Sequence, residues 1–267
     1  MMLGRTRCRR RMPLACLGAA VAVACIVGNA RAQHWVDFRR AEPFICRAEF
    51  SLAEYDGLFR QLHRIQNDLV RCLGIPPATE AIELYLFRDK DSYARYVKQY
   101  LPGVPYRRAL FVKADGPGRV YAYRSRDFEI DVRHECTHAL LHGALPMVPL
   151  WLDEGLAEYF EVPAEQRAFD NPHLGSLRWN VRLGLVPRLS DLETMHDLSE
   201  MGKAEYRSSW AWVHFILHGS REAHAELVRY LRDIQRRTPP GTMSERLTQR
   251  VPQAQKQFAA HFKGWKR

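Results

Sequence analysis

The sequence predicts an α+β fold in which a mixed sheet and its helices are followed by a mainly helical C-terminal part. Apolar and polar residues alternate over residues 82–87, which is typical of a β-strand. A turn sequence at Asp115–Gly118 separates two further strand-like runs and predicts a hairpin over residues 108–124. Apolar residues three and four positions apart instead predict a long helix over residues 52–72, and helical periodicity returns from Tyr206 onward.

The other elements of the first half follow from local signals. Residues 33–50 are expected to be extended, and the helix over residues 52–72 should end at Gly74. Asp91 is a suitable N-cap for a short helix that runs to Tyr100.

The second half contains a long irregular stretch between helices. Residues 163–190 include several prolines and glycines, have no steady period and predict a long loop beside the site. Helices are expected over residues 206–219 and 221–237. The breaker Pro239-Pro240-Gly241 then precedes a last helical segment.

The stretch His134-Glu135-Cys136-Thr137-His138 has the pattern H-E-x-x-H. On a helix, side chains four positions apart lie on one face, so His134 and His138 can bind one metal ion. Glu135 is then placed to act as a general base toward a metal-activated water. The helix is expected to begin at or near Asp131 and to stop at Gly143.

A catalytic zinc site usually has three protein ligands and one open position. The segment Pro149–Glu161 supplies a candidate third ligand, because it has a helical apolar stripe and carries Glu154 and Glu158 on a different face. Fifteen residues separate Glu154 from His138. Without the upstream histidines, these acids and Glu161 would be interpreted as a solvated face.

Together the two segments resemble the zinc-ligand motifs of the gluzincin metallopeptidases, in which H-E-x-x-H is followed by W-L-x-E-G-x-A, here Trp151–Ala157. The layout is similar to that of zinc aminopeptidases and of exported bacterial proteins of the peptidase MA-like superfamily. The resemblance implies a zincin-like fold with His134, His138 and Glu154 as Zn²⁺ ligands and Glu135 as the base. Fewer residues separate His138 from Glu154 than in the aminopeptidases. The loop between the two motifs therefore departs from the family pattern, whereas the implied ligand is unchanged.

A segment that begins at Tyr206 resembles a tyrosine-containing helix of the same families. There the tyrosine hydroxyl stabilises the oxyanion, which implies that Tyr206 is the electrophilic partner of the metal; the alternative is a core tyrosine at a helix start. The G-x-M-E-N strand of the aminopeptidases has no counterpart between Tyr106 and Asp131. The sequence therefore gives no support for an aminopeptidase and leaves an endopeptidase, another amidohydrolase and an inactive relative open.

Several neighbouring residues have predicted supporting or structural roles. Asp153 and Glu158 are predicted to support the ligand histidines, since a metal-bound imidazole normally donates its second N–H to a carboxylate or carbonyl. His142 lies too far along the helix from His134 to share a metal ion with both histidines. His214 shares a helix face with apolar side chains and is expected in the core. By fold analogy, Val120–Tyr123 is predicted to be the edge strand that borders the cleft.

Residues 1–32 have the features of a cleaved secretory signal, with a basic start, an apolar run and an Ala30-Arg31-Ala32 site. The prediction is an exported protein, periplasmic or extracellular, with no transmembrane segment after cleavage; a lipid anchor at Cys25 is the alternative. The formal net charge of +10 falls to +4 when the six arginines of this segment are removed. That balance gives little support for nucleic-acid binding.

Two subdomains are expected beyond the signal. Residues 33–145 would form the N-terminal zincin subdomain with the H-E-x-x-H helix, and residues 146–267 a helical subdomain with the third ligand. Cys46 and Cys72 are the pair that could form a disulfide after export, whereas Cys136 is expected to be a packed residue of the zinc helix.

These features predict an exported zinc metallopeptidase that hydrolyses peptide or protein substrates. One alternative is an exported protein that binds zinc structurally or keeps the site as a relic. The presence of Glu135 argues against it, because a structural site needs no base. Another alternative is a hydrolase of cell-wall or other non-peptide amides. The sequence leaves the natural substrate and the oligomeric state open.

Overall fold

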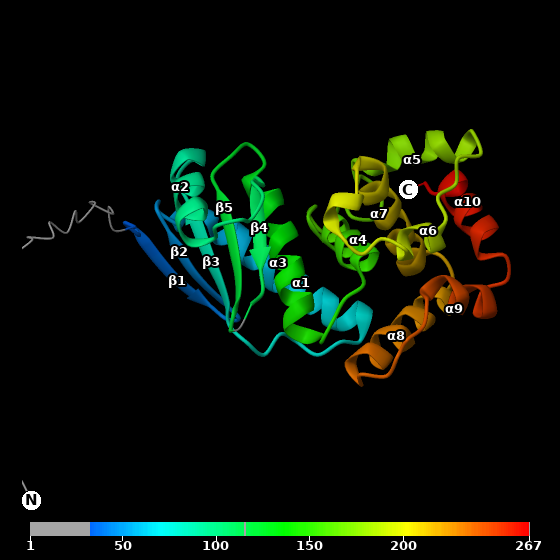
Figure 1. Ribbon diagram of the computed structural model, residues 1–267. Coiled ribbons are helices and arrows are strands. Elements are labelled where there is room, and N and C mark those ends of the chain that lie inside the picture. Colours follow the sequence, from blue (N-terminus) through cyan, green and yellow to red (C-terminus); the bar gives the residue numbers. More distant parts are fainter. Residues whose placement is uncertain (1–32, 115, 267) are drawn as a thin grey trace, which may run out of the picture. The chain divides into compact units, whose positions relative to one another are not determined.

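The fold is described from a computed structural model of the chain, which covers residues 33–114 and 116–266. From His34 onward the chain forms one compact unit. A five-stranded mixed sheet occupies its N-terminal part and is followed by a mainly helical region (Figure 1), as the sequence predicts. The signal predicted for residues 1–32 lies outside the described residues.

The sheet has the strand order β1-β2-β3-β5-β4. The outer pairs β1–β2 and β4–β5 are antiparallel, whereas β3 runs parallel to both β2 and β5. Strand β3 and the β4–β5 hairpin lie where the sequence predicts them. The strands are β1 (Asp37–Ala41), β2 (Phe44–Ala48), β3 (Ile82–Phe87), β4 (Ala109–Val112) and β5 (Gly118–Tyr123).

The prediction that Val120–Tyr123 forms the edge of the sheet is wrong. These residues belong to β5, which pairs with β3 on one side and with β4 on the other. The edge strands are β1 and β4, and Leu110 and Phe111 of β4 line the cleft described below. Alternation of apolar residues identifies a strand but does not show whether other strands pair with it on one side or on both. Only the observed strand pairing identifies the edge strands.

The two faces of the sheet are buried by different helices. Leu84 and Leu86 belong to the main core, whereas Phe87 and Tyr121 pack in a separate aromatic cluster. Helix α2 (Lys90–Tyr100) contacts β3 and β5. Its N-cap is Asp89, whose side chain accepts a hydrogen bond from the Ser92 backbone N–H, and not Asp91 as predicted.

Helices α1 (Asp56–Leu73) and α3 (Phe128–Ala144) pack against each other, and α3 also packs on β4 and β5. A short 3-10 helix η1 (Ala53–Tyr55) precedes α1, so the regular helix begins later than predicted. It ends at Gly74 as expected, because Gly74 adopts a φ of 66° that favours glycine.

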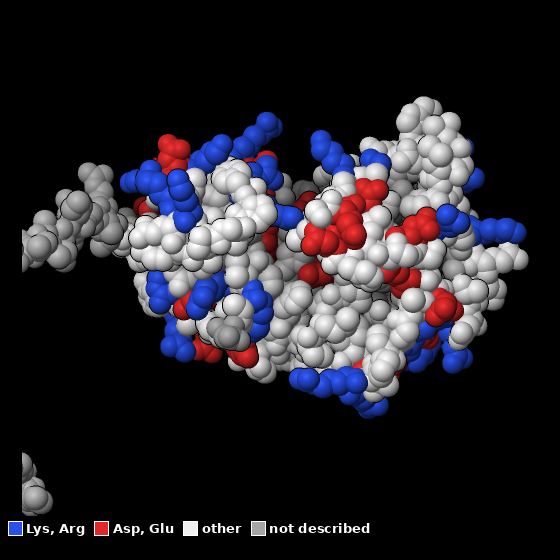
Figure 2. All heavy atoms as spheres, in the orientation of Figure 1, with Lys and Arg blue, Asp and Glu red and all other residues white. Residues whose placement is uncertain are grey.

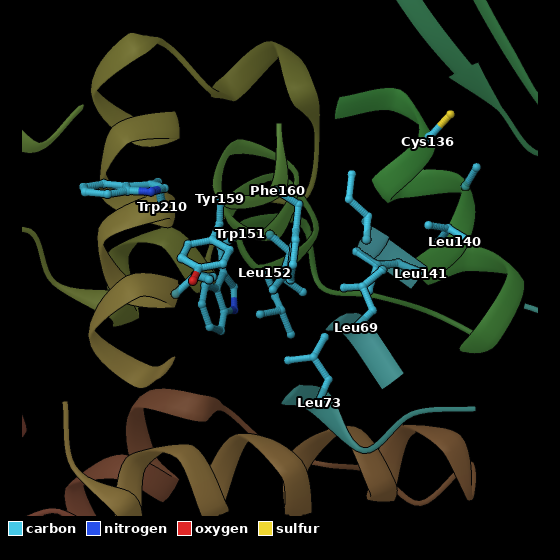
Figure 3. Close-up of a cluster of buried hydrophobic side chains, with 14 of the residues drawn as sticks. Leu69, Leu73, Cys136, Leu140, Leu141, Trp151, Leu152, Tyr159, Phe160 and Trp210 are labelled. Atoms are coloured by element: carbon cyan, nitrogen blue, oxygen red, sulfur yellow. The ribbon is translucent and has the colours of Figure 1, made fainter. Parts of the chain in front are cut away.

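The helical region packs around α4 (Leu150–Phe160), which contacts both α3 and α7 (Lys203–His218). Figure 3 shows buried side chains of α1, α3, α4 and α7, among them Trp151 and Trp210, gathered in this core. The other helices are α5 (His173–Arg182), α6 (Leu189–Glu193), η2 (Leu198–Glu200), α8 (Arg221–Gln235), α9 (Met243–Arg250) and α10 (Ala254–Gly264). None of the helices in the described ranges is long and apolar enough to span a membrane.

The predicted long loop over residues 163–190 is wrong, because α5 and the start of α6 lie within it. Leu174, Leu177 and Val181 of α5 are buried at helical spacing. This short apolar stripe is the sequence signal that indicates the helix. The prolines and glycines around it predict a loop more strongly, so the sequence alone does not reveal the helix.

The cysteines and His214 lie in the protein interior. All three described cysteines are free, so the expected Cys46–Cys72 disulfide is absent; Cys46 and Cys136 are fully buried. His214 is a core residue as predicted: its Nε2 is 2.9 Å from the Ala168 carbonyl oxygen and its Nδ1 is 3.1 Å from His261 Nε2. Burial lowers the pKa of His214 to about 3, which keeps the ring neutral.

Candidate metal centre

Helix α3 presents both histidines of the H-E-x-x-H motif to the same place. His134 and His138 are one helical turn apart, and their ring centroids are 4.9 Å apart. Nε2 of each ring points toward Glu154, a residue of α4. Because α3 and α4 pack directly against each other, the two motifs meet although fifteen residues separate His138 from Glu154.

The three side chains form a group that could hold a metal ion. Glu154 Oε2 lies 3.5 Å from His134 Nε2 and 3.6 Å from His138 Nε2. Two ligand atoms bound to one tetrahedral zinc ion at ordinary bond lengths lie about 3.3 Å apart. The spacing therefore fits an ion of that size, and within the described ranges the buried Glu154 forms ion pairs with these histidines alone.

A carboxylate holds the other nitrogen of each histidine. His134 Nδ1 is 2.9 Å from Glu161 Oε2, and His138 Nδ1 is 2.8 Å from Asp153 Oδ1. When Nδ1–H donates to a carboxylate, Nε2 keeps its lone pair for a metal, so these contacts fix the tautomer that ligation needs. Asp153 thus has the supporting place that the sequence predicts for it.

Glu158 does not contact either ligand histidine through a hydrogen bond. Its carboxylate is 2.7 Å from His173 Nε2, and it is Glu161 whose carboxylate lies beside Nδ1 of His134. The sequence contained a usable signal, because Glu161 lies seven residues, two helical turns, after Glu154. His134, Glu158 and Glu161 also form a second group whose ligand atoms lie close enough together to hold a metal ion.

Asp153 also joins His142 to the centre. The second oxygen of Asp153 is 2.9 Å from His142 Nε2, so one carboxylate bridges His138 and His142. His142 is therefore no member of the ligand group, as its position along the helix predicts, but it helps to hold Asp153 in place.

The charges around the histidines favour a cation in the centre. Burial alone would lower the pKa of His134, but hydrogen bonds to Glu154 and Glu161 raise it well above its usual value. Burial opposes a raised pKa for His138 too, yet the charge of Asp153 and its hydrogen bond raise that pKa to about 9. A site that binds protons this strongly offers the same negative field to a metal ion, which would displace them.

Glu135 faces a cleft of about 510 Å³ beside the ligand group. Burial raises the pKa of Glu135, and the charges of His134 and His138 partly offset this effect. A raised pKa suits a carboxylate that accepts and returns a proton near neutral pH. The cleft is lined by Val104, Pro105, Arg107, Leu110, Phe111, His134, Glu135, His138, Asp153, Glu154, Asp197, Leu198 and Ser199.

Tyr206 lies in the first turn of α7, half-buried and close to the ligand Glu154. Burial and the charge of Glu154 raise the pKa of Tyr206, whereas the nearby Arg107 lowers it. At neutral pH the hydroxyl therefore keeps its proton and can donate a hydrogen bond.

Gly155 permits α7 to approach the metal centre. A β-carbon at this position would lie 2.6 Å from the carbonyl oxygen of Ser209 and 2.8 Å from its carbonyl carbon. Only glycine allows α4 and α7 to pack this closely. The contact brings the start of α7, including Tyr206, close to Glu154, which precedes Gly155.

No protein-family model matches this chain, and no curated protein matches it in sequence.

The different places of Glu161 and Glu158 predict different effects on metal affinity. We expect Glu161→Gln to weaken zinc binding about 10- to 100-fold, because it removes the charge that supports His134. Glu158→Gln, which removes a charge paired with His173, should weaken binding less. Competition against a chromogenic zinc chelator measures both, and an equal or larger loss in Glu158→Gln would contradict the arrangement.

Proposed function

We propose that this protein is a zinc-dependent metallopeptidase of the gluzincin type, with His134, His138 and Glu154 as zinc ligands. The observation that carries the proposal is the convergence of these three ligand atoms beside Glu135 at the wall of a cleft. Two histidines and one glutamate form a donor set typical of catalytic zinc sites. The carboxylates on both Nδ1 atoms support the same conclusion, because they orient the rings for ligation.

The chemistry divides between the metal and the side chains of the chain. Zinc bound by this group would supply Lewis acidity for the peptide carbonyl and a water of lowered pKa. Glu135 accepts the proton of the attacking water and returns it to the leaving amine. Tyr206 donates a hydrogen bond to the developing oxyanion, for which its retained proton is suited.

The substrate is expected to bind along the edge strand β4. This strand has an unpaired side, and its Leu110 and Phe111 line the cleft that contains Glu135. An extended peptide can add to such an edge through backbone hydrogen bonds, with its side chains in the adjacent pockets. In this proposal the partner is a peptide or protein, and the protein acts after export from the cell, with residues 1–32 as its secretory signal.

Two other functions would use the same residues differently. A structural zinc site normally has four protein ligands and no open position, whereas three ligand side chains converge here next to a cleft. A hydrolase of non-peptide amides would share the metal and the base, and its substrate would differ only in the groups that the cleft binds.

Metal removal tests the proposal. We expect the purified protein to contain about one zinc ion per chain, to cleave casein and quenched peptides, to lose cleavage with a chelator and to regain it with zinc. Elemental analysis and fluorescence release measure the two quantities. A protein that binds no zinc would refute the ligand assignment, and zinc without cleavage across a broad panel would favour one of the other two functions.

A further inference from the structure

Arg107 is the one arginine among the described residues that line the cleft, and it has a different environment from its neighbour Arg108. The Arg108 guanidinium binds Asp127 and Asp131, each at 2.7 Å, which fastens this loop to the start of α3. Arg107, by contrast, is exposed and forms no ion pair within the described part of the chain. Its guanidinium is close enough to the side chain of Tyr206 to lower the pKa of that hydroxyl.

Arg107 lies in the same cleft as the candidate metal ligands and the proposed base. It lines the cleft with Glu135, His134 and His138, and its charge acts on both Glu135 and Tyr206. A guanidinium has five N–H donors in a planar fork, and one contact with a hydroxyl leaves most of them free. These donors match the two oxygens of a carboxylate in geometry and charge.

The opposite wall of the cleft does not neutralise Arg107. That wall contains Asp197, Leu198 and Ser199, and Figure 2 shows acidic side chains gathered over the segment between α6 and α7 that includes them. The Asp197 carboxylate already accepts a hydrogen bond from the Ser199 backbone N–H at 2.7 Å, which caps η2. The pKa of Asp197 is lowered first by the Ser199 side chain and then by this backbone hydrogen bond, and the charge of Arg107 makes only a small contribution.

We propose that Arg107 is a specificity-determining residue that binds a carboxylate of the substrate next to the bond to be cleaved. This inference rests on the proposed peptidase function and adds the substrate class, namely peptides with an acidic group near the scissile bond. That group is either a Glu or Asp side chain or the free carboxylate at the C-terminus of the peptide.

The test measures binding without turnover, in zinc-loaded Glu135→Gln protein. The probes are three peptides of the same length with a blocked N-terminus. The first has a free C-terminal carboxylate, the second is its C-terminal amide, and the third is a C-terminal amide with an internal Glu. Calorimetry gives the dissociation constants. We expect one of the two acidic peptides to bind about tenfold or more tightly than the neutral amide. Adding Arg107→Gln should abolish this preference, and adding Arg107→Lys should restore part of it, because lysine keeps the charge but not the fork.

Arg95→Gln is the matched control, since Arg95 is an exposed arginine of α2 outside the cleft. It should leave all three dissociation constants unchanged. The acidic peptide that is preferred identifies the source of the carboxylate. Equal binding of all three peptides, or a preference that survives Arg107→Gln, would overturn the proposal.

Cleavage separates this inference from the proposed function. With otherwise wild-type protein, the ratio of kcat/KM for acidic over neutral peptides should fall about tenfold in Arg107→Gln. Absence of cleavage of every peptide would count against the peptidase, while the binding preference would still decide the role of Arg107.

Discussion

Replacement of Glu135 by glutamine should abolish hydrolysis and leave the metal bound. The expected loss in kcat is about 10³-fold or more, because an amide side chain cannot accept the proton of the attacking water. Glu135 lines the cleft but is not a member of the group that could hold the ion, so zinc content should match that of the unmodified protein. Initial rates on a quenched peptide and elemental analysis of the same preparation measure both effects.

Glu129→Gln provides the control on the same helix. Glu129 is an exposed residue of α3 that contacts Arg133 and lies outside the cleft, so this change should preserve both zinc and activity. Loss of zinc in Glu135→Gln would show that Glu135 is a ligand, and retained turnover would show that another group is the base.

Replacement of Gly155 by alanine should have the largest effect on stability of any single methyl addition near the site. The added carbon would meet the Ser209 backbone at 2.6 Å, and backbone cannot rotate away as a side chain can. We expect a loss of about 2–3 kcal/mol in the free energy of unfolding, since overpacking outweighs the gain in helix propensity. Urea denaturation followed by far-UV circular dichroism measures it.

Gly175→Ala is the corresponding control in α5. Gly175 is exposed within the helix, and a β-carbon there would have no neighbour within 4 Å. Alanine should therefore stabilise the protein by up to about 1 kcal/mol through helix propensity alone. If Gly155→Ala unfolds at the same urea concentration as the unmodified protein, the close approach of α4 and α7 is not required for stability.

Local periodicity made much of the metal centre predictable. The spacing of His134 and His138 places both rings on one side of α3 wherever that helix packs, because 3.6 residues complete one turn. The paired acids of the second segment and its resemblance to the gluzincin motif made Glu154 the expected third ligand, and the structure brings its carboxylate to within 3.6 Å of both imidazoles. Strand β3 and the β4–β5 hairpin were equally local, since alternation and a turn sequence define them.

The supporting residues depended on how elements pack. Glu158 and Glu161 come one and two helical turns after Glu154, so the sequence does not distinguish them. Only the packing of α4 against α3 places Glu161, and not Glu158, beside His134. In the same way, α5 was hidden among prolines and glycines, and its burial against α7 and α10 became visible only in the structure.

The sequence by itself predicted the members of the candidate centre: the spacing of His134 and His138 within α3 follows from one helix, and the motif around Glu154 indicated the third member. The tertiary structure alone decided which strand forms the edge, which carboxylate supports His134, and that Arg107 lines the same cleft as Glu135. The physical reason is that side-chain direction within a helix follows from its repeat, whereas contacts between elements follow from strand pairing and close packing across the whole core.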